Sequence, residues 1–95
     1  MASSLDISPF LHAIADPARR RILQTLKEKG SVHSKGLCAG DVEDCVKLSQ
    51  PTISHHMKIL EKAGLVEVKK EGTWRRYRRN EKGIKLAIQQ MKAQI

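Results

Sequence analysis

The sequence predicts a mainly α-helical domain with one small β-hairpin, taken to span residues 1–95. Apolar residues recur at three- and four-residue spacing along most of the chain, which is typical of helices packed on a core. Two short stretches rich in strand-forming residues flank Glu71-Gly72 and predict the hairpin. With one Phe, one Trp and one Tyr in 95 residues, the small core is expected to be aliphatic.

Two helices are expected in the first third of the chain. Residues 5–15 carry apolar side chains three and four positions apart. Asp16 then suits an N-cap and Pro17 the first turn of a longer helix, which Gly30 ends. The three arginines at positions 19–21 lie near the start of that helix, where the helix dipole disfavours cations. That cost suggests partners for some of them, although a solvated face is the commoner explanation for such a cluster.

Residues 30–40 are expected to form a loop, because they contain three of the six glycines. A short helix follows this loop, with Gly40 or Asp41 as its cap. Side chains at helical spacing form the inner face that this helix is expected to bury: Val42, Cys45 and Val46.

A second helix follows a tight turn around residues 47–49, and the pair forms a helix-turn-helix. Ser49 is placed to cap this helix, and Gly64 follows its end, where a left-handed cap is expected. The core stripe at helical spacing is Ile53, His56, Met57 and Leu60. His55 lies ~200° from Ile53 around the helix, so it is expected to point away from the core.

A basic hairpin and a last helix complete the chain. A strand is expected to begin at residues 65–68, to turn at Glu71-Gly72 and to return along TWRRYRR, residues 73–79. Residues 81–95 are expected to form the last helix. The apolar face of this helix consists of Ile84, Ala87, Ile88, Met91 and Ile95.

The formal net charge of +8 indicates a polyanionic partner, either nucleic acid or an anionic membrane surface. The helix-turn-helix favours double-stranded DNA, because the major groove admits one helix. Gln50, Thr52 and Ser54 lie in the first turns of the second helix, where base edges would be closest. Their side chains suit bases or phosphates. The alternative, a solvated polar face on an ordinary helical hairpin, leaves the following run of cations unexplained.

Three motifs resemble the ArsR-type (ArsR/SmtB, arsenic-repressor) winged-helix transcription regulators. They are ADPARRRIL at 15–23, LSQPTISHHMKIL at 48–60 and GLVEVKKEGTWRRYR at 64–78. The resemblance covers roughly residues 8–80. It implies a winged helix-turn-helix homodimer that represses transcription. Its two recognition helices would enter successive major grooves of an inverted-repeat operator, with an effector that is unidentified or absent.

The resemblance also implies which residues carry these roles. The residues expected to contact DNA are Ser49, Gln50, Pro51, Thr52, Ser54, His55, Lys58, Lys70, Arg75, Arg76 and Arg78. The dimer interface is expected on the first and last helices, at about residues 5–15 and 81–95. Its apolar contacts would be Phe10, Leu11, Ile14, Ile84, Ile88 and Met91.

Many members of this family bind thiophilic metals through a CxC pair, in a motif like LCVCDL. This chain reads LCAGDV at 37–42, so Cys38 is kept and Gly40 replaces the second cysteine. A second family site uses Asp and His pairs on the last helices, whereas residues 81–95 contain no His, Asp or Cys. No cofactor is therefore expected.

The alternative is a metal- or redox-responsive repressor that uses Cys38 and Cys45. Asp41, and His33 in the preceding loop, would be further ligands for Zn²⁺ or a softer ion. The burial expected for Cys45 argues against this alternative, since a buried cysteine behaves as a small hydrophobe. A disulfide would require the two Cα atoms to lie within about 7 Å.

Two other classes of function fit less well. Adjacent helical residues diverge by ~100°, so His55 and His56 do not converge as a catalytic pair, and no enzymatic activity is expected. The cations of the hairpin argue against a module that only binds proteins. Neither a signal peptide nor an apolar span of ~18 residues is visible, so a cytoplasmic protein without a membrane partner is expected.

Overall fold

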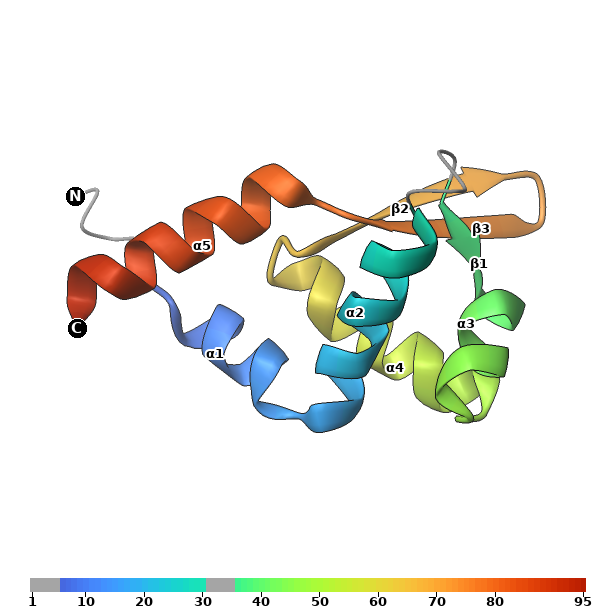
Figure 1. The fold of residues 1–95 in the computed structure, drawn as a ribbon. Helices are drawn as coiled ribbons and strands as arrows, with labels where there is room; N and C mark the ends of the chain where they lie inside the picture. Colours follow the sequence, from blue (N-terminus) through green and yellow to red (C-terminus); the bar gives the residue numbers. More distant parts are fainter. Residues whose placement is uncertain (1–5, 31–35) are drawn as a thin grey trace.

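A computed structural model describes residues 6–30 and 36–95, and it confirms a mainly helical fold with a small sheet (Figure 1). The helices and strands are α1 (Ser8–Ala15), α2 (Pro17–Gly30), β1 (Leu37–Cys38), α3 (Ala39–Val46), α4 (Gln50–Lys62), β2 (Val66–Glu71), β3 (Trp74–Arg79) and α5 (Glu81–Gln94). Helices α3 and α4 form the predicted helix-turn-helix, and β2 and β3 form the predicted hairpin.

Capping groups confirm most of the predicted helix boundaries. The Asp16 carboxylate accepts a hydrogen bond from the Ala18 N–H at 2.7 Å, at the start of α2. Ser49 caps α4 by accepting from the Thr52 N–H. Lys47 takes a left-handed conformation in the turn between α3 and α4, and Gly64 has φ of +78° just past α4, as a left-handed cap requires.

Two helix starts differ from the prediction. Helix α1 begins at Ser8, because the Asp6 carboxylate accepts the Ser8 N–H at 2.9 Å. Helix α3 begins at Ala39, with Cys38 as its N-cap in place of Gly40 or Asp41. Asp41 is instead the third helical residue, and its carboxylate accepts the Cys38 N–H at 3.2 Å. This return bond is half of a capping box, so Asp41 stabilises a helix that starts two residues earlier.

A third strand corrects the expectation of a loop over residues 30–40. The sheet has the order β1-β3-β2 and is antiparallel throughout. Leu37 pairs with Tyr77, and Cys38 pairs with Arg76. The turn between β2 and β3 is made by Gly72-Thr73, one position later than predicted, and Gly72 has φ of +61°. A two-residue strand is too short to produce a periodic pattern in the sequence.

The core lies between the helices and one face of the sheet. Its buried members are Phe10, Ala13, Ile22, Leu26, Leu37, Val42, Val46, Ile53, Met57, Leu60, Leu65, Val66 and Tyr77. Cys45 does not belong to it, since its side chain is exposed on α3, which corrects the predicted inner face of that helix. Only Val42 and Val46 of that face are buried.

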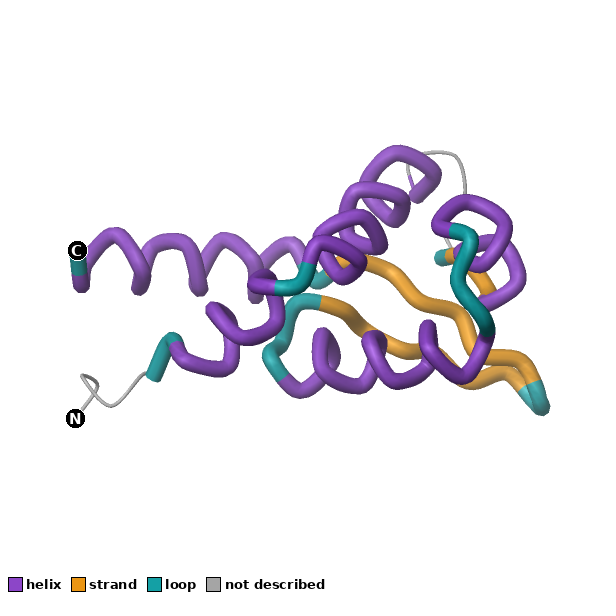
Figure 2. The backbone as a smooth tube through the Cα atoms, turned by 90° about the horizontal axis from the view of Figure 1, so that it is seen from below, coloured by secondary structure: helices purple, strands orange, loops and turns teal. Residues whose placement is uncertain are grey.

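Helix α5 projects away from the body and lies on the same side of it as α1 (Figures 1 and 2). None of its described side chains is fully buried. The start of α5 is nevertheless fixed, because the Asn80 side chain accepts the Gly83 N–H at 3.1 Å. The backbone at Gly83 also lies so close to the Gly64 carbonyl that a Cβ atom would collide with it.

Candidate nucleic-acid interface

Helix α4 has one polar face that no other part of the described structure covers. Gln50, Pro51, Thr52, His55 and Lys58 are exposed, and Ser54 is half-buried. Pro51, His55 and Lys58 lie on the side opposite Ile53, Met57 and Leu60, which are buried, whereas Gln50, Thr52 and Ser54 flank that buried stripe in the first turns of the helix. The face therefore has the shape and polarity of a helix that reads a groove.

The adjacent histidines of α4 lie on different sides of the helix, as predicted. The His55 side chain is exposed, whereas His56 is buried with 8% of its surface accessible. The two ring centroids are 5.7 Å apart and the rings are tilted by 51°. The pair therefore does not form a single site.

Two hydroxyl groups at the start of α4 already have protein partners. The Ser49 and Thr52 hydroxyl oxygens lie 2.9 Å apart, at hydrogen-bond distance. The Ser49 hydroxyl also accepts the Thr52 N–H. Each hydroxyl oxygen keeps further hydrogen-bonding capacity, but the first task of Ser49 in this structure is to cap the helix.

Side chains alternate between the two faces of the hairpin. Lys70 pairs with Arg75, two positions beyond the pair of Val68 and Tyr77 that packs against the core. Lys70 and Arg75 therefore lie on the face of the sheet that the helices cover, close to the tip of the hairpin. Both side chains are exposed, because they lie beyond the edge of the core.

A hollow of about 340 Å³ lies between α4, the start of α3 and the tip of the hairpin. Gln50 and Ser54 line it from α4, and Thr73 and Arg75 line it from the hairpin. The tertiary structure thus brings the open face of α4 and Arg75 of the β2–β3 hairpin (the wing) together on the same side of the molecule.

The other two predicted wing contacts lie on the outer face of the sheet. Arg76 is half-buried, and its Nη1 donates to the Gly36 carbonyl at 3.5 Å. Its Nε lies 3.3 Å from a Glu71 carboxylate oxygen, an ion-pair distance without hydrogen-bond geometry. Arg78 Nε donates to Glu67 at 3.1 Å across the two strands, although the Arg78 side chain is largely exposed. Arg76 is therefore held against its own chain, which argues against the predicted DNA contact.

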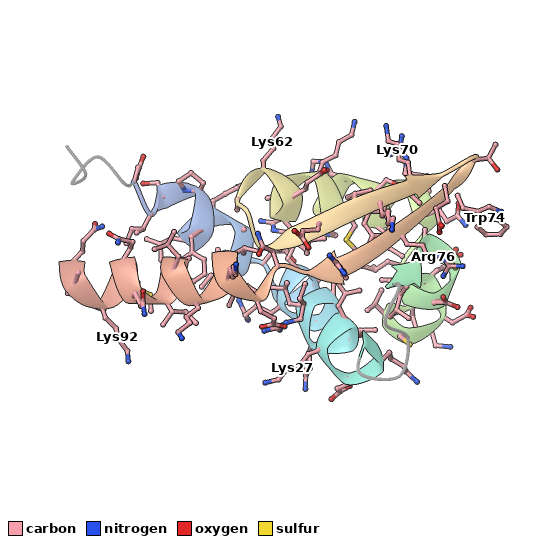
Figure 3. All side chains as sticks on the ribbon, turned by 90° about the horizontal axis from the view of Figure 1, so that it is seen from above. Lys27, Lys62, Lys70, Trp74, Arg76 and Lys92 are labelled. Carbon is pink, nitrogen blue, oxygen red and sulfur yellow. The ribbon has the colours of Figure 1, made fainter. Side chains whose placement is uncertain are left out.

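Trp74 is a candidate that the sequence prediction omitted. It is the first residue of β3 and is 63% exposed. Figure 3 shows it at the far end of the hairpin, beyond the helices. Trp74 therefore offers an exposed aromatic ring beside Arg75, in the hollow that the hairpin tip shares with α4. The sequence could have indicated this exposure, because a tryptophan that directly follows the Gly-Thr turn lies at the tip of the hairpin, away from the core.

The possible thiol site is incomplete in the described structure. The Cys38 thiol donates to the Asp41 carboxylate at 3.1 Å. Cys45 lies on the exposed side of α3, and His33 lies outside the described residues. In residues 6–30 and 36–95, no three His, Cys, Asp or Glu side chains gather as a metal site would need.

The faces predicted to form a dimer interface are partly open. Leu11 on α1 and Ile88 on α5 are exposed, and Ile14, Ile84 and Met91 are half-buried. Leu86 is a further exposed apolar residue of α5. Phe10 differs from the prediction, since it is buried in the core of its own chain and leaves little surface for a partner.

The space between α1 and α5 is a hollow of about 320 Å³. Ile7, Pro9 and Phe10 line one side of it, and Leu86 and Ala87 line the other. This hollow lies between two helices that each carry an exposed apolar side chain, Leu11 on α1 and Leu86 on α5.

A helix-turn-helix followed by a hairpin, with an open polar face on its second helix, defines a winged helix-turn-helix DNA-binding protein. Comparison with known proteins agrees with this class. A helix-turn-helix domain family matches residues 14–69. An uncharacterised helix-turn-helix-type transcriptional regulator from Methanocaldococcus jannaschii is 49% identical over 65 residues, which are 68% of this chain and 67% of that protein.

Two further relatives identify the branch of this class. An arsenical resistance operon repressor from Staphylococcus xylosus is 37% identical over 75 residues, covering 79% of this chain and 66% of that protein. The crystal structure of a possible transcriptional regulator for arsenical resistance has a TM-score of 0.72 at 29% identity, covering 87% of this chain and 80% of that one. The chain belongs to the ArsR-type helix-turn-helix family and is a DNA-binding transcriptional regulator.

The helices within residues 6–30 and 36–95 do not meet the requirements of a membrane span. All of them are too short or too polar to cross a bilayer.

Proposed function

We propose that this regulator represses transcription as a homodimer bound to an inverted-repeat operator, with α4 as the recognition helix. The observation that carries the proposal is the hollow that the α4 face shares with the hairpin tip. A duplex whose major groove receives α4 would bring its backbone to Arg75 and Lys70, which lie on the same side. The net charge of +8 favours such a partner.

The residues divide into two roles in this proposal. Gln50, Ser54 and His55 read base edges, because they lie in the first turns of α4 and their side chains can hydrogen-bond to bases. The remaining predicted contacts position the duplex through its phosphates: Ser49, Thr52, Lys58, Lys70, Arg75 and Arg78. Pro51 contributes apolar contact, and Trp74 contacts the groove next to the hairpin tip.

The dimer is supported by the apolar surface that one chain leaves open. Leu11 on α1 and Leu86 on α5 are 42% and 48% exposed, and Leu86 also lines the hollow between the two helices. A second copy of the same two helices would cover them. Two recognition helices held in this way would match the two halves of an inverted repeat.

Thiol-dependent regulation is the second candidate. It is favoured by the contact between Cys38 and Asp41, which line one hollow together with Trp74 of the wing. A metal or oxidant at Cys38 would act close to the DNA-binding surface. The exposure of Cys45 removes the argument from burial that had counted against this site, but the described residues supply no third ligand. We therefore favour a repressor whose effector does not bind at this site. We also propose that the protein has no enzymatic activity and acts in the cytoplasm.

Selection of bound sequences from random DNA tests the main proposal. An enriched inverted repeat is expected, and random recovered sequences would contradict it.

His55→Ala should then weaken binding to the selected operator by roughly 1–3 kcal/mol while leaving non-specific binding nearly unchanged. Equal operator affinity in the variant would exclude His55 as a base reader. Repeating the selection with Zn²⁺, Cd²⁺, arsenite or an oxidant, on wild type and Cys38→Ser, tests the thiol alternative.

A further inference from the structure

Arg19 is a buried cation at the junction of three helices. Its side chain is 7% exposed, and it lies in the first turn of α2. Its Nε donates to the Ala13 carbonyl at 2.8 Å, and its Nη2 donates to the His12 carbonyl at 2.9 Å. Both carbonyls belong to the last turns of α1, where a cation is favoured by the helix dipole.

The third partner of Arg19 is a side chain of the recognition helix. Arg19 Nη1 lies 3.1 Å from His56 Nδ1, and both side chains are buried. A guanidinium group has only donors, so His56 Nδ1 must accept through its lone pair. The contact therefore requires a neutral His56 ring with its proton on Nε2. In a protonated ring, the His56 Nδ1–H would face the Arg19 Nη1–H, and two cations would be in contact.

The groups that surround His56 act in opposite directions. Asp16, at the start of α2, favours the protonated ring, and its carboxylate lies 3.8 Å from Arg19 Nη1. Burial, the Arg19 guanidinium and the neighbouring His55 favour the neutral ring. The net result is that the pKa of His56 is lowered from its ordinary value, mainly through burial.

We propose that Arg19 is a positioning residue that fixes α4 against the end of α1 through neutral His56, and that acid weakens operator binding by breaking this contact. His56 follows His55 directly in the chain, so a shift of its ring moves the neighbouring open face of α4. This inference rests on the proposed function, because it assumes that α4 reads the operator.

The test compares wild type with His56→Gln, whose amide oxygen accepts from Arg19 at every pH. Operator affinity is measured by fluorescence anisotropy from about pH 7.5 to about pH 5.5 at constant ionic strength. The wild-type affinity divided by the variant affinity should fall by about tenfold, the effect of losing one charge-assisted hydrogen bond. The ratio removes the effects of pH on the DNA, which both proteins share. A flat ratio would overturn the proposal.

His12→Gln is the matched control. The His12 side chain is exposed, and only its backbone carbonyl contacts Arg19. Its affinity relative to wild type should stay constant over the same range. A decline as large as that measured against His56→Gln would mean that acid acts through histidines in general, and it would refute the specific role of His56.

NMR of the wild-type protein gives a readout that does not need the variant to fold or the DNA to bind. At neutral pH the His56 ring nitrogens should report an unprotonated Nδ1. The amide signals of α4 should shift with the same midpoint as the His56 ring. The positioning role would be refuted by a protonated Nδ1 at neutral pH, or by α4 amide signals that do not shift with the His56 ring. Failure of operator binding at pH 7.5 would instead refute the proposed function.

Discussion

Arg19 Nη1 of α2 lies 3.1 Å from His56 Nδ1 of α4, with both side chains buried. The contact explains why an arginine is placed where the dipole of its own helix disfavours it. Arg19 and Arg20 both turn back to the preceding helix, and Arg20 donates to the Ile14 and Ala15 carbonyls at 2.6 and 3.1 Å. These carbonyls end α1 and have no intrahelical donors, so the two arginines complete its C-terminus.

Stability should fall when the pH decreases through the range in which His56 titrates. The pKa of His56 is lowered in the folded protein, mainly through burial, relative to its ordinary value of 6.5. Between these two values the unfolded chain binds more protons than the folded protein. The free energy of unfolding therefore decreases as the pH falls from neutrality, and the contribution is fully lost below the folded pKa. Thermal melts of wild type and His56→Gln should diverge over this range.

The lowered pKa of Asp16 provides an internal check on this prediction. The Ala18 N–H is its main cause, and the effect on stability is confined to pH values near or below the ordinary 3.8. If the free energy of unfolding decreases only in that lower range, the titrating groups are carboxylates, and the role assigned to His56 is wrong.

Arg75→Ala should reduce the salt dependence of operator binding. Each lost phosphate contact lowers the slope of log K against log salt by about 0.9, or about 1.8 for the two subunits of a dimer. Arg76→Ala is the matched control in the next position, because Arg76 is half-buried against Gly36 and Glu71. Its slope should equal that of wild type. Identical slopes for wild type and Arg75→Ala would show that Arg75 does not contact DNA.

Ile88→Glu should weaken the proposed dimer by at least tenfold, because it places a carboxylate on the apolar face of α5. Gln89→Glu introduces the same side chain on the neighbouring exposed position. Sedimentation velocity over a range of concentrations measures both variants. A dimer that survives Ile88→Glu, or a wild type that is monomeric, would exclude α5 as the interface.

Gly83→Ala should destabilise the protein although alanine is the better helix former by about 1 kcal/mol. The added Cβ would collide with the Gly64 carbonyl, a backbone atom that cannot move aside. Strain of this kind costs about 1–3 kcal/mol. Gly30→Ala is the control at the end of α2, where an added Cβ would meet no neighbouring atom within 4 Å. Thermal melts should show a lower Tm for Gly83→Ala only.

The elements with long periodic patterns could be predicted from the sequence. Helices α2, α4 and α5 extend over 13 or 14 residues with the expected apolar spacing, and α2 and α4 also have the capping residues that were expected, Asp16 and Ser49. The outward side of His55 and the inward side of His56 followed from the helix period alone. Strand β1 could not be predicted, because Leu37 and Cys38 become a strand only by pairing with β3.

Errors in the prediction occurred where several elements meet. Val42 and Val46 are buried while Cys45 between them is exposed, because α3 presents a narrow stripe to the core. Phe10 belongs to the core of its own chain although its spacing also fits an interface. Spacing identifies an apolar face, but it does not identify which surface covers that face.

The sequence by itself determined the helix-turn-helix, the hairpin and the polar face of α4, because local hydrogen bonding and side-chain period specify each of them. Only the tertiary structure decided which cations remain free to meet DNA. Arg19 is buried against α1 and His56, Arg76 is held near Gly36, and Arg79 donates to Glu81 and to the Leu23 carbonyl. Arg75 remains exposed beside α4. The physical reason is that the sequence gives the position of each charged residue along the chain but not the groups that will surround it. Folding determines whether a carbonyl, a carboxylate or only solvent lies beside the charge.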